Sequence, residues 1–204
     1  MPAKAVILAE GDRPTQMLRM VSGQATRRRT LLDGRSQLLS VLLPGDIIGV
    51  QSLFGGVLRE AIEAVTDVSV QVASYADIHR LASTNTNVAF WLIWQANQEN
   101  IKIEKWLTVL THGTAIEKIA YVLLDFHRRI GDAADGRAQL PLTQREIAEH
   151  VGLTLPHVCR MLARLREHGA IGLRYGTIEI LQPHMLLDSA RELRELLEDH
   201  VVEA

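Results

Sequence analysis

Short apolar stretches separated by turn residues make up the first third of the chain. Glycine or proline recurs between residues 11 and 56, and several stretches between them alternate apolar and polar side chains. A period of two is typical of β-strands with one buried face. The pattern predicts strands over residues 5–9, 17–21, 24–31, 37–43, 60–66 and 68–74. Many short strands at such spacing favour an antiparallel barrel or jelly roll.

After Ala76 the apolar period lengthens to about 3.6, and glycine and proline are absent until Gly113, which predicts a long helix. One row of this helix has the spacing of a coiled-coil seam: Leu92, Ala96, Glu99, Ile103, Trp106 and Leu110. Such a seam needs an apolar partner, so we predict a homodimer formed through residues 87–110. We assign the contact to Leu92, Ala96, Ile103, Trp106 and Leu110. The alternative is that the row packs on the barrel of its own chain, and Glu99 weakens the coiled-coil interpretation.

A second helix is predicted over residues 114–130, and it ends at Gly131. The next residues, 131–139, are rich in glycine, alanine and aspartate, as expected of a linker. A domain boundary is therefore expected nearby.

A helix-turn-helix pattern follows the linker. Thr143 and Glu146 form the sequence of a capping box, which predicts a helix start. Gly152 supplies a turn, and Thr154 then caps a second helix that carries Pro156 in its first turn. The apolar spacing predicts a shared core of Ile147, Val151, Leu153, Val158 and Met161, with small Ala148 at the point of close approach. Residues 172–180 then form a small hairpin, so the whole segment is predicted to be a winged helix-turn-helix.

The outward face of the second helix is predicted to enter the major groove of double-stranded DNA. The candidate DNA-binding residues are Thr143, Thr154, Leu155, Pro156, His157, Cys159, Arg160, Arg164 and Tyr175. The charge distribution agrees with this prediction. Residues 137–182 carry six arginines against four glutamates, whereas residues 184–204 carry two arginines against six acidic residues.

The overall composition excludes several classes of protein and of binding site. The chain has 204 residues, 47% of them hydrophobic and 23% charged, which is typical of a globular protein with one large or two small domains. A single cysteine excludes an internal disulfide framework and a zinc site with several thiolates. No apolar run is long enough to span a bilayer, and no signal peptide is visible, so we expect a cytoplasmic protein without a membrane partner.

The two halves together resemble the Crp/Fnr family of bacterial transcription regulators. The resemblance rests on the motifs Glu10-Gly11-Asp12 and Val21-Ser22-Gly23, on the Pro44-Gly45-Asp46 turn, and on residues 142–171. It implies an α+β fold with a cyclic-nucleotide-binding-like jelly-roll barrel over residues 1–84. A dimerisation helix over 85–112 and a winged helix-turn-helix domain over 113–204 would follow. It also implies promoter DNA and RNA polymerase as partners.

Several residues depart from the family pattern. A family nucleotide pocket carries Gly-Glu-Leu and Arg-Ser, where this chain has Gly49-Val50-Gln51 and Arg59-Glu60. Val50 cannot accept a hydrogen bond from a ribose, and Glu60 would repel a phosphate, so cyclic AMP is not expected as the effector. One cysteine cannot hold an iron–sulfur cluster, and no cofactor is expected. Pro156 stands where many members place a glutamate that reads cytosine, which favours a different operator.

Two other functions remain open on the sequence. A cyclic-nucleotide-responsive regulator is one, and a barrel enzyme with an accessory helical domain is the other. The enzyme is disfavoured because the first histidine is His79, beyond the barrel strands. Cys159 lies beside Arg160 early on a helix, where positive charge favours a reactive thiol, and it is a candidate redox switch.

Overall fold

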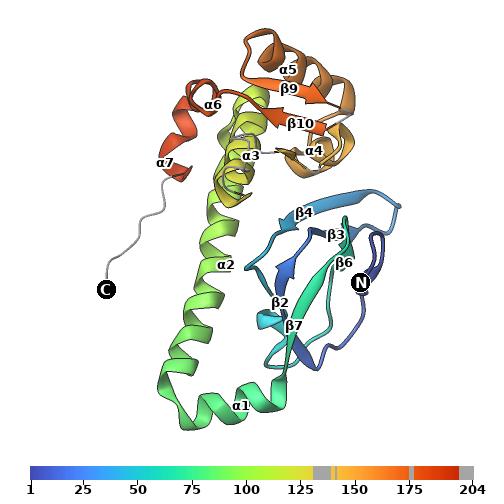
Figure 1. Cartoon of the computed structure of the whole chain (residues 1–204), viewed down its shortest axis with the longest axis vertical. Coiled ribbons are helices and arrows are strands. Elements are labelled where there is room, and N and C mark those ends of the chain that lie inside the picture. The colour runs from blue at the N-terminus through green and yellow to red at the C-terminus, as the bar shows by residue number, and fades with distance from the viewer. Residues whose placement is uncertain (131–138, 141, 175–176, 198–204) are drawn as a thin grey trace. The chain divides into compact units, whose positions relative to one another are not determined.

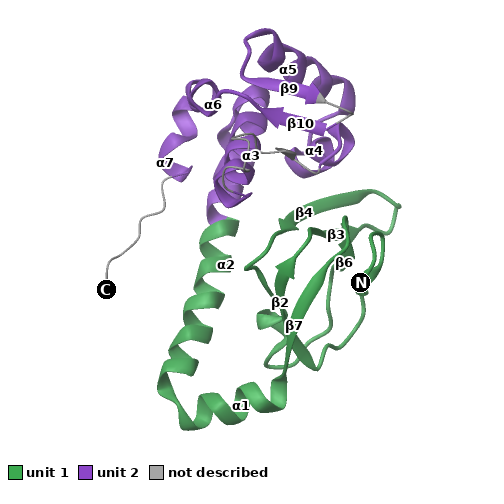
Figure 2. Ribbon diagram, viewed as in Figure 1, with its two compact units in different colours: residues 1–103 green, residues 104–204 purple. Residues whose placement is uncertain are grey.

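The computed structural model describes residues 1–130, 139–140, 142–174 and 177–197. The chain forms two compact units, residues 1–103 and 104–204 (Figure 2). The linker predicted at 131–139 lies outside the described residues except at its last position. That position, Gln139, begins a short strand instead.

Unit 1 contains two antiparallel sheets (Figure 1). The strands are β1 Val6–Leu8, β2 Gln16–Ser22, β3 Ala25–Thr30, β4 Ser36–Leu42, β5 Ile47–Ile48, β6 Ala61–Ala64 and β7 Ser69–Ser74. One sheet has the order β1-β6-β3-β4 and the other β5-β2-β7. Six of these strands overlap the predicted ranges, and β5 was not predicted.

The inward side chains of the two sheets form one apolar cluster. Its fully buried members include Met20, Ala25, Ile48 and Ile62. Gly23, in the turn between β2 and β3, has φ 81°, and a Cβ there would stand 2.1 Å from the Asp67 carbonyl oxygen. Glycine is therefore required at this turn, as the Val21-Ser22-Gly23 motif indicated.

Two helices follow the sheets in the chain, α1 Tyr75–Thr84 and α2 Thr86–His112. Tyr75 of α1 donates its hydroxyl hydrogen to the Gly49 carbonyl at 2.7 Å. A second apolar cluster joins the start of α2 to this end of unit 1, and it contains Met17, Val50, Leu53, Tyr75, Ile78 and Leu92. At 27 residues, α2 is about 40 Å long.

Unit 2 is built around α3 Ala115–Ile130, in which the six consecutive residues 119–124 are all buried, so the middle of the helix is enclosed on every side. The other elements are α4 Gln144–Val151, α5 Leu155–Glu167, the strands β8 Gln139–Leu140, β9 Ile171–Arg174 and β10 Thr177–Ile180, and α6 Pro183–Ser189, η2 Arg191–Leu193 and α7 Arg194–Leu197. The strands form a sheet with the order β8-β10-β9. The predicted hairpin is confirmed, whereas β8 and the helices after β10 were not predicted. The predicted fold class, an α+β chain with a barrel-like domain, a long helix and a winged helix-turn-helix, is confirmed.

Candidate nucleic-acid interface

Helix α4 begins at the capping box that the sequence predicted. The Thr143 hydroxyl accepts a hydrogen bond from the Glu146 amide at 3.2 Å. Glu146 Oε2 in turn accepts from the Thr143 amide at 2.8 Å. Both exchanges satisfy amides that the first turn of a helix leaves without partners, so the start of α4 is fixed by local sequence.

The turn between α4 and α5 depends on Gly152. This residue lies in the left-handed region with φ 67° and ψ 32°, and its amide donates to the Ala148 carbonyl. Leu153 donates to the same carbonyl at 3.1 Å. The predicted turn is confirmed, since only three residues separate the two helices.

Helix α5 begins with Thr154 at its N-cap position, as predicted, but the Thr154 side chain makes no capping hydrogen bond. Pro156 lies in the first turn, where a missing amide hydrogen costs little. The start of α5 is thus set by backbone and proline, and the Thr154 hydroxyl, on an exposed residue, is available for another contact.

The inner face of α5 packs into unit 2, where Val158 is fully buried and Met161 is 7% exposed. From α4, Ile147 and Val151 join the same core and are at most 1% exposed. Leu153, the fifth predicted core residue, is half-buried. Their burial fixes the rotation of α5 about its own axis and therefore determines which side chains point outward.

The outer face of α5 carries exposed Pro156, Arg160 and Arg164, which follow one another at intervals of four residues. Leu155 and His157 beside them are half-buried. The predicted contact Tyr175 lies outside the described residues. The described outer face is therefore basic, with two guanidinium groups about one helical turn apart.

Cys159 occupies a different place from the outward residues. It is half-buried, and its Sγ donates a hydrogen bond to Gln144 Oε1 of α4 at 2.9 Å. The thiol therefore connects the two helices of the motif, at the edge of the outer face of α5.

The residues of α2 that were predicted for dimerisation fall into two groups, those that contact their own chain and those that are exposed. Leu92 is buried in its own chain, and the Trp106 ring stacks on His150 of α4. Glu99 forms an ion pair with Arg27 of β3. Ala96 and Ile103 are exposed, and Leu110 is half-buried. Leu92 and Trp106 thus contact their own protomer.

A neighbouring row of α2 is more exposed than the predicted one. We call it the Ile93 row, and it consists of Ile93, Ala96, Asn100, Ile103, Leu107 and Leu110. Ile93 is 65% exposed, and Ile103 and Leu107 are 60% exposed. Its spacing of 3 and 4 fits a coiled-coil seam as well as the first row does. The apolar spacing in the sequence therefore indicated a seam on α2, but it fitted two rows that share Ala96, Ile103 and Leu110.

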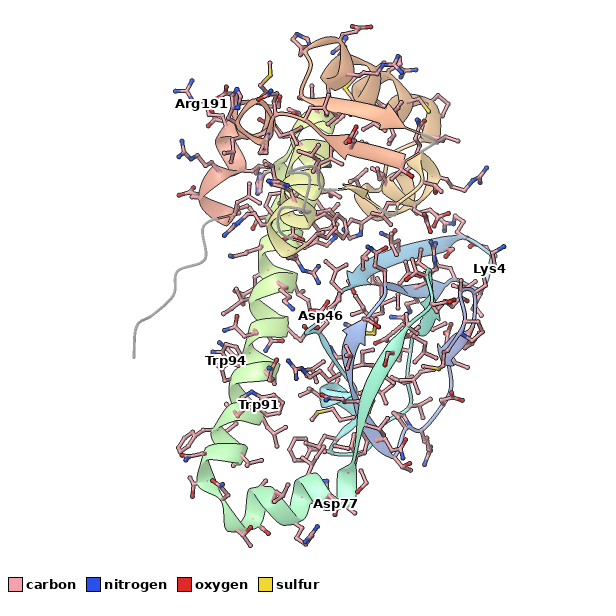
Figure 3. All side chains as sticks on the ribbon, in the orientation of Figure 1. Lys4, Asp46, Asp77, Trp91, Trp94 and Arg191 are labelled. Atoms are coloured by element: carbon pink, nitrogen blue, oxygen red, sulfur yellow. The ribbon has the colours of Figure 1, made fainter. Side chains whose placement is uncertain are left out.

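Exposed aromatic side chains accompany this row near the start of α2. Trp94 is 53% exposed and Phe90 65% exposed, while Trp91 is 39% exposed. Figure 3 labels Trp91 and Trp94 along α2. Large apolar side chains on a helix surface commonly mark a contact with another molecule.

The described residues offer no candidate metal centre. No cluster of three or more His, Cys, Asp or Glu side chains among them could hold a metal ion. Val50, at the position where a nucleotide pocket would need a carboxylate, is buried among apolar side chains. Across the described part of the chain, no helix has the length and apolar character needed to cross a membrane.

Comparison with known proteins gives two family matches. Residues 1–85 match the model of a cyclic nucleotide-binding domain. Residues 117–189 match the model of a Crp-like helix-turn-helix domain.

Relatives resemble the chain over most of its length. The nitrogen fixation regulation protein FixK of Rhizobium meliloti is 29% identical over 181 residues, which cover 88% of this chain and 81% of the relative. The transcriptional activator protein FnrL of Cereibacter sphaeroides is 29% identical, with 97% of this chain and 79% of the relative covered. The solved structure of FixK2 from Bradyrhizobium japonicum superposes with a TM-score of 0.82 at 30% identity, covering 92% of this chain and 93% of that one.

Proposed function

Because this chain belongs to the Crp/Fnr family of transcription regulators, we propose that it binds promoter DNA as a homodimer and contacts RNA polymerase there. The family consists of DNA-binding regulators and not of enzymes. A regulator that reads bacterial promoters acts in the cytoplasm. The observation that carries the proposal is the exposed basic face of α5, with Arg160 and Arg164 directed away from a buried inner face.

Helix α5 is the element that reads DNA. An α-helix fits the major groove, and an arginine can bind guanine O6 and N7 with two hydrogen bonds. We assign this base contact to Arg160. Thr143, Thr154 and Arg164 are placed for contacts to base edges or phosphates, and Leu155, Pro156, His157 and Cys159 supply the remaining surface of the helix. Tyr175, which follows β9 in the sequence, is proposed to touch the DNA backbone.

The operator differs from one that is read by an acidic residue at position 156. Pro156 is exposed in the first turn of α5, and it has neither a donor nor an acceptor on its side chain. It can contact a thymine methyl group but cannot accept a hydrogen bond from cytosine N4. We therefore expect the operator position that faces Pro156 to prefer a different base from the one that an acidic residue would select.

The protomers associate through α2, within the segment 85–112. We assign the contact to the Ile93 row, because its apolar members are exposed while Leu92 and Trp106 pack in their own chain. Asn100 lies in the middle of the row. A single polar residue at a seam position favours one register and one oligomeric state at some cost in stability.

The effector, if the barrel binds one, is not cyclic AMP. Val50 lies within an apolar cluster and has no oxygen for a ribose hydroxyl. Glu60, in the place of a serine that would hold a phosphate, adds negative charge. Titration calorimetry with cyclic AMP should show no binding.

The DNA-binding proposal is tested with the dimeric protein and a pool of randomised duplexes. Selection and sequencing of bound duplexes should yield a two-fold symmetric operator with half-sites about one helical turn apart. Arg160→Ala should weaken binding to it by about 1–3 kcal/mol, which is about 5-fold to 150-fold. Arg166→Ala is the matched control, because Arg166 is an exposed arginine on another face of α5. Equal effects of the two substitutions would refute the assignment of Arg160.

The dimer is tested by sedimentation. Ile103→Glu places a charge in the seam and should give monomers at micromolar concentration. Thr108→Glu adds the same charge at an exposed position of α2 outside the Ile93 row and should leave the dimer intact. A wild-type monomer, or an Ile103→Glu variant that remains dimeric, would contradict the proposal.

A further inference from the structure

Helix α2 offers two overlapping rows to a second protomer. The Leu92 row contains Leu92, Ala96, Glu99, Ile103, Trp106 and Leu110, and the Ile93 row contains Ile93, Ala96, Asn100, Ile103, Leu107 and Leu110. The two rows share three residues. The members that differ are neighbours in the sequence and lie about 100° apart on the helix, so a rotation of about 50° moves the centre of one row to the centre of the other. Some other part of the protein must therefore determine which row faces a partner.

An ion pair within unit 1 holds one of the differing residues. Arg27 Nη1 of β3 lies 3.3 Å from Glu99 Oε2 of α2, and the two side chains are only 13% and 24% exposed. Arg27 and Glu99 are 72 positions apart in the sequence. The contact therefore joins the barrel directly to the middle of α2.

Two further charges support this pair. Lys102 Nζ lies 3.0 Å from Glu99 Oε1 and 4.0 Å from Asp46 Oδ1. Asp46 is itself fixed, because its Oδ2 accepts a hydrogen bond from the Leu43 amide at 2.8 Å. Figure 3 shows Asp46 on the side of the barrel that faces α2. The turn Pro44-Gly45-Asp46 is thus part of the same attachment.

The pair sets the rotation of α2 about its axis. Leu92 and Glu99 are seven residues apart, nearly two turns, so both lie on the side of the helix that contacts the barrel. Leu92 is buried there. Asn100 follows Glu99 by 100° of rotation and is exposed together with Ile93 and Ile103.

We propose that Arg27 and Glu99 are positioning residues whose ion pair selects the Ile93 row of α2 for contact with the second protomer. The inference rests on the homodimer proposed above. Two costs oppose the alternative row. Turning Glu99 toward a partner would place a carboxylate in an apolar seam, and it would leave the largely buried Arg27 guanidinium without its carboxylate.

Disulfide crosslinking between protomers tests the selection. In a Cys159→Ser background, Asn100→Cys reports on the Ile93 row and Leu92→Cys on the Leu92 row. With Arg27 present, the protein with Asn100→Cys should crosslink at least several-fold more than the protein with Leu92→Cys. Adding Arg27→Met should lower the first yield and raise the second. Arg29→Met, which removes an exposed arginine from the same strand, is the control and should change neither.

A charge exchange keeps the test decisive if Arg27→Met unfolds the barrel. Arg27→Glu combined with Glu99→Arg restores an ion pair, so Asn100→Cys should crosslink in this background nearly as well as with the native pair. Equal yields for Asn100→Cys with Arg27→Met and with Arg29→Met, both folded, would overturn the inference. So would a charge-exchanged, folded dimer that crosslinks only through Leu92→Cys. A wild-type protein that sediments as a monomer would instead refute the homodimer and the inference with it.

Discussion

The Trp106 ring of α2 stacks on the His150 ring of α4, with centroids 4.2 Å apart and an angle of 12° between the planes. The Tyr121 ring of α3 also lies near the Trp106 ring, with the two ring centroids 6.2 Å apart. His150 is only 8% exposed. The end of α2 is therefore packed against the first helix of the helix-turn-helix motif inside unit 2.

Removal of the Trp106 ring should destabilise unit 2. Trp106→Ala leaves a void between three helices, and we expect a loss of about 3 kcal/mol in the free energy of unfolding. Trp106→Phe keeps an aromatic ring on His150 and should lose less, since an aromatic pair contributes about 1 kcal/mol beyond its buried area. Urea unfolding followed by circular dichroism measures both.

Trp94→Ala is the matched control for this effect. Trp94 lies on the same helix but is 53% exposed in the protomer. Its removal should leave the unfolding of unit 2 unchanged. If Trp106→Ala and Trp94→Ala lowered the free energy of unfolding equally, the stacking of Trp106 on His150 would make no specific contribution to stability.

The two threonines that begin α4 and α5 should respond differently to substitution. Thr143 accepts a capping hydrogen bond, so Thr143→Ala should lower the free energy of unfolding by about 1 kcal/mol, and Thr143→Ser should restore most of it. Thr154 makes no such bond, and Thr154→Ala should cost much less. Its effect should appear in operator affinity instead. The prediction is wrong if both alanine variants lose the same stability.

The sequence predicted the helix-turn-helix motif well because its determinants are local. The capping box, Gly152 and the apolar spacing all act within a few residues of one another. The sequence alone left two rows of α2 with suitable spacing for a dimer contact. The proposed choice between them depends on Arg27, whose strand is distant in the sequence from α2. Strands β5 and β8 have two residues each, too few to show any period.

Stability at low pH should depend on Glu99. Burial alone would raise the pKa of its carboxyl, but the Lys102 ammonium and the Arg27 guanidinium outweigh burial and hold that pKa below the ordinary 4.5. A lowered pKa in the folded state means that ionised Glu99 stabilises the protein fully above pH 4.5 and loses this effect as the pH falls through its folded value.

Thermal unfolding between pH 7 and pH 3 checks this dependence. Glu99→Gln should lower the melting temperature near neutral pH, and its difference from wild type should shrink as the solution becomes acidic. Glu104→Gln, which neutralises an exposed carboxylate on the same helix, should show no comparable convergence. A constant difference between wild type and Glu99→Gln across this range would contradict the linkage.

Reversible oxidation of Cys159 should weaken DNA binding. Peroxide converts a thiol to a sulfenic acid with release of water. This step removes the S–H group that donates to Gln144 Oε1 at 2.9 Å and adds an oxygen where α4 and α5 meet. The half-buried sulfur stands next to Arg160, so the added oxygen should displace the outer face of α5. We therefore expect a lower affinity for the operator.

Operator affinity before and after peroxide, and again after a thiol reductant, measures the switch. Wild type should lose affinity several-fold and recover it on reduction. Cys159→Ser, which retains a small hydrogen-bond donor to Gln144, should bind the operator as tightly as reduced wild type and should not respond to peroxide. If both proteins respond alike, the oxidised group lies elsewhere. If neither responds, Cys159 serves only as a contact between the two helices of the motif.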